Sequence, residues 1–166
     1  MKDDCGVALF IDHYNILDGC NNVGIPGYTY DVLVEVASKA GQMVLGRVYL
    51  VTDRSSAGML HKFFEFGIEP VYAPEYKTGD DEKRKSLADP MMVCDIMQTL
   101  YERLFIKTFV IVSGDKDFIP LIRKIAEHGK RAIVIGVEGS TSYPLIKECD
   151  RLHFDFLNYS DIHRNP

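Results

Sequence analysis

At 166 residues, the chain has the length of one domain, and we expect residues 1–166 to fold as a single unit. Hydrophobic residues make up 46% and charged residues 26% of the chain, as is typical of soluble globular proteins, and no apolar run approaches the roughly 18 residues that cross a membrane. The formal net charge of −5 disfavours non-specific binding to phosphate backbones unless divalent cations neutralise some of the carboxylates.

Short apolar runs bounded by turn residues alternate with stretches of helical periodicity. The runs predict strands at residues 7–11, 47–52, 68–73, 108–112 and 131–137, with 152–156 as a candidate for a last edge strand. The periodic stretches predict helices at residues 30–40, 55–66, 89–103, 117–128 and 143–149. Asp89 followed by Pro90 is typical of a helix start, with Asp89 as the capping residue. Residues 74–86 are polar and highly charged, and they are predicted to form an exposed loop.

This alternation predicts an α/β fold of three layers, in which helices cover both faces of a parallel sheet. Right-handed crossovers favour the strand order 3-2-1-4-5, which makes the first and fourth strands neighbours. In such sheets, ligands bind beyond the carboxyl ends of the strands, at the point where the strand order reverses. We therefore expect the functional site to follow the first and fourth strands.

Both of these strands lead into aspartates. Asp12 ends the first strand, and Asp115 and Asp117 follow the fourth. Asp95 lies among apolar residues of the helix that leads into the fourth strand, where an unpaired carboxylate would be costly. Carboxylates that share a pocket repel one another, and a hard cation such as Mg²⁺ or Mn²⁺ relieves that repulsion. We expect Asp12, Asp95 and Asp115 to converge on such a metal.

Each acidic residue also has a purely structural interpretation. Asp12 could cap the turn after its strand, and Asp115 could bond to backbone N–H groups of its loop. Asp117 could cap the helix that starts near Phe118, and capping is favoured over a role in the site for Asp89. Asp95 could be a solvated helix residue. Asn15, three residues after Asp12, could be a simple turn former.

The charged segment 74–86 carries four basic side chains just before the helix that contains Asp95. They could hold RNA phosphates near an acidic site, and they are Lys77, Lys83, Arg84 and Lys85. The alternative is that this segment is simply solvated, because acidic residues are interleaved with the basic ones.

Two motifs resemble those of the NYN family, which belongs to the PIN-like nuclease superfamily. Phe10-Ile11-Asp12-His13-Tyr14-Asn15 is similar to the F-I-D-x-x-N opening of that family. The segment 112–121 is similar to its V-S-G-D-x-D-F-x-P-L signature, and Asp89 with Asp95 resembles its pair of helix aspartates. The resemblance covers residues 7–157 and is greatest to the LabA-like branch.

The resemblance implies a PIN/NYN fold and a divalent-metal-dependent endoribonuclease. It implies that Asp12, Asp95, Asp115 and Asp117 bind metal or activate water. It also implies that Asn15 and Ser113 orient these groups or the substrate. Asp89 would support the site from outside the set of metal ligands.

Two other classes of function are weighed against a ribonuclease. An RNA-binding or regulatory module on the same fold, with weak or absent cleavage, is the main alternative. A phosphatase that needs Asp-x-Asp after the first strand is disfavoured because His13-Tyr14 follows Asp12. Nucleotide-binding glycine motifs are absent from the sequence. Four widely spaced cysteines and a short acidic N-terminus suit a cytoplasmic protein, and a homodimer is left open.

Overall fold

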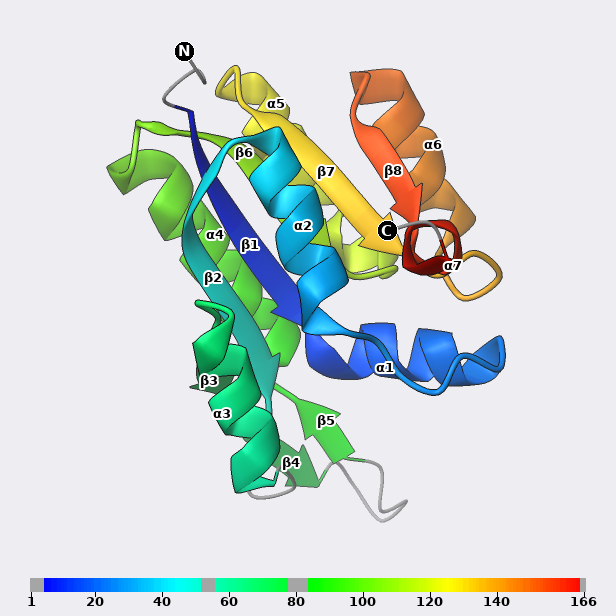
Figure 1. Cartoon of the computed structure of the whole chain (residues 1–166). Coiled ribbons are helices and arrows are strands. Elements are labelled where there is room, and N and C mark those ends of the chain that lie inside the picture. Colours follow the sequence, from blue (N-terminus) through cyan, green and yellow to red (C-terminus); the bar gives the residue numbers. More distant parts are fainter. Residues whose placement is uncertain (1–4, 52–55, 78–83, 165–166) are drawn as a thin grey trace.

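The fold is built on a six-stranded, fully parallel sheet (Figure 1). We describe residues 5–51, 56–77 and 84–164 of a computed structural model. The strand order is β3-β2-β1-β6-β7-β8. The strands are β1 (Gly6–Asp12), β2 (Gln42–Leu50), β3 (Glu69–Tyr72), β6 (Ile106–Val112), β7 (Arg131–Gly136) and β8 (Asp155–Asn158). The predicted order 3-2-1-4-5 is confirmed, and β8 adds the extra edge strand beside β7.

Helices cover both faces of the sheet, as predicted. One face is covered by α1 (His13–Asn22), α2 (Tyr30–Ala40), α3 (Ala57–Glu65) and α7 (Tyr159–Arg164). The other face is covered by α4 (Ala88–Glu102), α5 (Ile119–Glu127) and α6 (Tyr143–Leu152).

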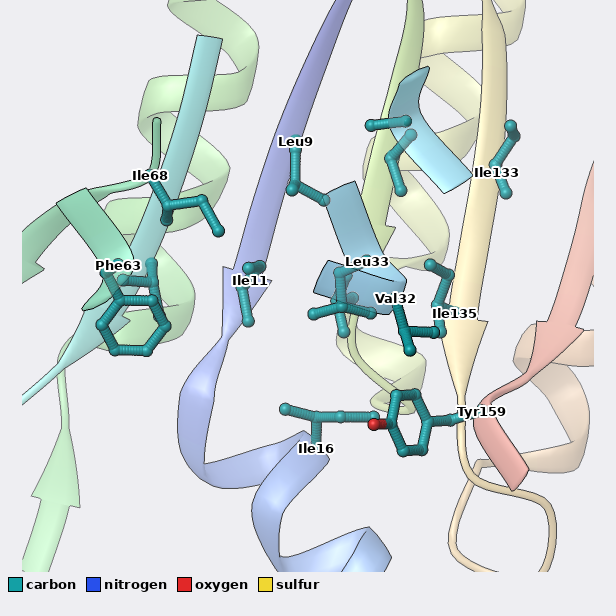
Figure 2. Close-up of a cluster of buried hydrophobic side chains, with 14 of the residues drawn as sticks. Leu9, Ile11, Ile16, Val32, Leu33, Phe63, Ile68, Ile133, Ile135 and Tyr159 are labelled. Atoms are coloured by element: carbon teal, nitrogen blue, oxygen red, sulfur yellow. The ribbon is translucent and has the colours of Figure 1, made fainter. Parts of the chain in front are cut away.

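Strand β1 is buried along its whole length and divides its side chains between the two helix layers. Val7, Leu9 and Ile11 enter the core beneath α2, whereas Ala8 and Phe10 enter the core beneath α4. Figure 2 shows Leu9 and Ile11 within the first of these cores. Because side chains alternate along a strand, the next residue, Asp12, follows Phe10 toward the α4 side. This alternation decides which helix can reach Asp12.

Three local predictions need correction. Residues 74–86 were predicted to be a loop, but β4 (Glu75–Lys77) and β5 (Arg84–Ser86) pair as an antiparallel hairpin. Helix α1 was not predicted at all. Helix α4 begins at Ala88, and therefore Asp89 lies in its first turn rather than at its cap. The Ala88 backbone N–H instead donates to Ser86 Oγ at 3.1 Å.

Among the described residues, no helix is both long enough and apolar enough to cross a bilayer.

Candidate active site

Asp12 occupies the junction between β1 and α1. It is the N-cap of α1, and its Oδ1 accepts a hydrogen bond from the Asn15 backbone N–H at 3.3 Å. Its Oδ2 accepts a hydrogen bond from the Ser113 hydroxyl at 3.2 Å. Only 6% of Asp12 is exposed. Asp12 does cap a helix, but the Ser113 contact also fixes its carboxylate toward the end of the neighbouring strand β6.

Asn15 and Gly114 join the loops that follow these two strands. Asn15 Oδ1 accepts a hydrogen bond from the Gly114 backbone N–H at 2.7 Å. Gly114 has no room for a side chain, because a Cβ atom there would lie 2.8 Å from Thr141 Oγ1. Asn15 is therefore more than a turn former, since its side chain connects α1 to the loop after β6.

Asp115 lies next to this connection and caps a short 3₁₀ turn, η2 (Lys116–Phe118). Its backbone N–H donates to Ser113 Oγ at 3.3 Å, and its Oδ1 accepts from the Asp117 backbone N–H at 2.9 Å. Asp115 is half-buried and Asp117 is exposed. The N-cap of α5 is Phe118, so Asp117 does not cap that helix.

The fourth carboxyl group comes from Asp89 in the first turn of α4. Its side chain lies against that of Asp12, close enough for each carboxyl group to affect the protonation of the other. Burial raises the pKa of Asp12 well above its usual range, and the charge of Asp89 raises it further. Burial also raises the pKa of Asp89, and the charges of Asp115 and Asp117 add to that rise.

The four carboxyl groups form an electrostatically unfavourable cluster. None of the ion pairs between described residues involves Asp12, Asp89, Asp115 or Asp117. Within the same residues, no three His, Cys, Asp or Glu side chains are close enough to enclose a metal ion as they stand. The donor chemistry nevertheless fits a hard divalent cation, because all four groups offer carboxylate oxygens. Such a cation would compete with protons for the carboxyl oxygens of Asp12 and Asp89.

The sequence model of the NYN domain family matches residues 6–158 of the chain. The chain belongs to the NYN domain family. It is therefore a member of the PIN-like nuclease superfamily. The matched range contains all four carboxyl groups as well as Asn15 and Ser113.

The chain is similar to two further proteins. The NYN domain is 34% identical over 144 residues to an uncharacterized protein of Methanocaldococcus jannaschii. That alignment covers 87% of this chain and 52% of the relative, so the chain spans about half the length of that relative. A crystal structure of a Vibrio parahaemolyticus protein of unknown function has a TM-score of 0.81 at 23% identity, with 98% of each chain covered. This second similarity concerns the fold.

Asp95 has other partners in this NYN domain. Its Oδ2 lies 3.1 Å from Arg47 Nη1 and accepts a hydrogen bond from the Tyr49 hydroxyl at 2.6 Å. Asp89 is six residues nearer the start of α4, and a helix rises 1.5 Å per residue, so about 9 Å of helix separates the two aspartates. The structure thus brings Asp89, and not Asp95, against Asp12. Arg47, on β2, neutralises the half-buried carboxylate of Asp95, for which the sequence analysis expected a metal ion as the partner.

The predicted basic residues lie on or near the β4–β5 hairpin. Lys77 and Lys85 are exposed, and Lys85 lies four residues before Asp89. Tyr76 pairs with Lys85, and the backbone of Lys77 pairs with that of Arg84. Lys83 lies outside the described residues.

Sequence reasoning overlooked one basic residue beside the acidic cluster. Lys116 follows Asp115 directly and lines a shallow pocket of about 350 Å³ together with Asn15 and Ser142. The signal was available, because Lys116 lies inside the Ser113–Asp117 motif.

Proposed function

We propose that this NYN domain is a divalent-metal-dependent ribonuclease that hydrolyses RNA phosphodiester bonds at the carboxyl ends of β1 and β6. Membership of the NYN family supports a nuclease that acts on RNA. The observation that carries the proposal is the close approach of the Asp12 and Asp89 carboxyl groups, with the charge of Asp115 beside them. Acidic groups held together at this cost are typical of a site that a cation completes.

In this proposal, Asp12, Asp89 and Asp115 hold Mg²⁺ or Mn²⁺. The exposed Asp117 contributes to metal binding or to activation of water. When bound, such a metal polarises the phosphoryl oxygen and lowers the pKa of a bound water. Ser113 orients the Asp12 carboxylate through its hydroxyl. Asn15 holds the Gly114 backbone, which fixes the position of the adjacent Asp115.

Asp95 receives a different role from the one expected of a metal ligand. Its contacts with Arg47 and Tyr49 attach α4 to β2. Since Asp89 lies on the same helix, we propose that Asp95 is a positioning residue that sets the approach of Asp89 to Asp12. A metal ligand and a positioning residue differ in how their removal affects turnover.

The basic residues of the hairpin are proposed to bind the RNA backbone. The chain between Lys85 and Asp89 can span at most about 14 Å, so a phosphate held by Lys85 would lie near the acidic cluster. Further phosphates along the RNA strand would contact Lys77, Lys83 and Arg84. The cytoplasmic location, a homodimer, a single domain over residues 1–166 and the LabA-like branch stay predictions.

The test is cleavage of end-labelled RNA with Mg²⁺, with Mn²⁺ and with a chelator. We expect metal-dependent cleavage by the wild type and its loss in Asp12→Asn, Asp89→Asn and Asp115→Asn. Asp150→Asn is the matched control, because Asp150 is an exposed aspartate on α6 outside the cluster. RNA binding without cleavage in either metal would instead indicate a binding module. If the wild type neither binds nor cleaves RNA, only the family membership and the fold remain supported.

A further inference from the structure

A second pocket lies at the opposite end of the sheet from the acidic cluster, where the strands begin. It has a volume of about 560 Å³ and is formed by the ends of α2 and α6 and the starts of β6 and β7. In Figure 1 this is the end of the sheet near the N label, away from α1 and the hairpin. Five basic side chains line it, namely Lys39, Lys107, Lys130, Arg131 and His153, and no Asp or Glu is among the described residues that line it. This concentration of basic side chains is unexpected in a chain of net charge −5.

Lys107 and Lys130 are forced together by strand register. Thr108 of β6 pairs with Arg131 of β7, and each lysine comes one residue earlier on its own chain segment. Neighbouring strands lie only about 4.8 Å apart, so the two side chains start close together. The pKa of Lys130 is lowered by burial and then by the adjacent charge of Lys107. Two like charges in contact are unfavourable unless an anion joins them.

The remaining cations are only partly neutralised. Lys39 pairs with Glu35 at 2.6 Å, and Arg131 pairs with Asp155. The Lys130 ammonium donates to the Leu104 carbonyl oxygen at 2.6 Å, which satisfies one donor but adds no negative charge. Within the described part of the chain, neither Lys107 nor Lys130 has a carboxylate partner. The four Lys and Arg side chains and their two acidic neighbours together carry a net charge of about +2 near neutral pH.

We propose that this pocket binds a phosphate monoester as its dianion. A charge of −2 matches the uncompensated charge, and a phosphate oxygen between Lys107 and Lys130 would relieve their repulsion. Lysine supplies point charges to phosphate, and the guanidinium of Arg131 supplies a planar pair of donors. A pocket of this volume also has room for the organic group that the phosphate carries. The site is separate from the acidic cluster and does not depend on the ribonuclease proposal.

The experiment is calorimetric titration of the whole chain with adenosine 5′-monophosphate, inorganic phosphate and adenosine. It is run in chelator, so that no metal draws phosphate to the acidic cluster. We expect the monophosphate and inorganic phosphate to bind and adenosine not to bind. Tighter binding of the monophosphate would show that its organic group adds contacts, and equal affinities would show that the phosphate alone is recognised.

Lys107→Glu is the decisive variant. It replaces a like-charge contact with an ion pair to Lys130, so we expect a melting temperature no lower than that of the wild type. Phosphate affinity should fall by about tenfold or more, because an attraction becomes a repulsion. Lys62→Glu is the control of equal charge change, since Lys62 is an exposed lysine on α3 outside this pocket.

Three results would overturn the proposal. The first is absence of binding to the wild type, and the second is equal loss of affinity in Lys107→Glu and Lys62→Glu. The third is binding of an oligoribonucleotide without a terminal phosphate that matches the monophosphate in affinity and in dependence on Lys107. That result would assign the pocket to the nucleic-acid backbone.

Discussion

The carboxyl groups of Asp12 and Asp89 lie against each other, although one comes from the end of β1 and the other from the first turn of α4. Burial and the neighbouring charges raise the pKa of both groups, so folding favours their protonated forms. A proton and a divalent cation therefore compete for the same oxygens. This competition makes the site testable by pH as well as by metal.

The first prediction concerns stability against pH in chelator. Because folding raises the pKa of Asp12, its favourable contribution is present below its unfolded pKa and is lost as the pH rises through its folded pKa. The paired carboxylates therefore destabilise the fold at pH 7 to 8. Asp89→Asn removes one charge, and we expect its melting temperature at that pH to exceed that of the wild type by about 2 to 4 °C. The advantage should shrink toward pH 4, and Asp150→Asn should show neither effect.

The second prediction concerns binding of metal. Saturating Mg²⁺ or Mn²⁺ should raise the melting temperature of the wild type, because a ligand that binds only the folded state stabilises it. At 100 times the dissociation constant this amounts to about 2.7 kcal/mol. Asp89→Asn and Asp115→Asn should each lose most of the shift in differential scanning fluorimetry. Equal shifts in the wild type and both variants would remove these residues from the metal site.

The third prediction separates the roles of Asp89 and Asp95. Asp89→Asn should reduce RNA turnover by more than about 100-fold, because loss of a metal ligand forfeits several kcal/mol of charge stabilisation. Asp95→Asn should reduce turnover far less and lower the free energy of unfolding by about 1 to 2 kcal/mol, since it leaves Arg47 without its half-buried partner. Turnover under saturating RNA and urea unfolding measure the two quantities. A greater loss of turnover in Asp95→Asn than in Asp89→Asn would restore Asp95 as the ligand.

The fourth prediction concerns RNA affinity in chelator, where cleavage cannot occur. Lys77→Ala with Lys85→Ala should weaken binding and reduce the slope of log affinity against log salt by about one per lysine. Fluorescence anisotropy at several salt concentrations gives both values. Lys62→Ala should leave the slope unchanged. An unchanged slope in the double variant would show that the hairpin is simply solvated.

The fifth prediction concerns His13, the residue after Asp12. Burial lowers its pKa to about 4, and its Nδ1 lies 2.6 Å from the Tyr28 hydroxyl. Because the folded state resists protonation of His13, its contribution to stability falls as the pH drops from 6.5 toward 4. That slope is opposite in sign to the slope from Asp12. His13→Gln should leave the Asp12 slope unopposed, so urea midpoints between pH 4 and 6.5 should fall more steeply with rising pH than in the wild type.

Much of the fold follows from local sequence. Apolar runs predicted all five core strands, and right-handed crossovers predicted their order, because both depend on short-range patterns. The hairpin was missed because three-residue strands in a charged segment carry no pattern of alternation. Helix α1 was missed because its ten residues include several types that favour turns over helices, among them Asn15, Gly19 and Asn21.

The acidic site was predictable only in part. Asp12 and Asp115 end buried strands, and the end of a strand is visible in the sequence. The choice between Asp89 and Asp95 depends on where α4 begins and on a partner from β2, and neither is local information. Asp89–Pro90 has the pattern of a cap, but Ser86 provides the hydrogen bond to the helix start instead.

The β4–β5 hairpin is joined directly to the start of α4, the helix that carries Asp89. The Leu87 backbone N–H donates to the Pro74 carbonyl at 3.0 Å, and Ser86 Oγ accepts from Ala88, so the base of the hairpin is fixed to the first turn of α4. Asp12 and Asp115, by contrast, are held by the loops after β1 and β6. If the hairpin holds RNA as proposed, a force on it would act on Asp89 more directly than on Asp12 or Asp115. In that case the substrate would help to align the site, and damage to the hairpin would lower the turnover number as well as the affinity.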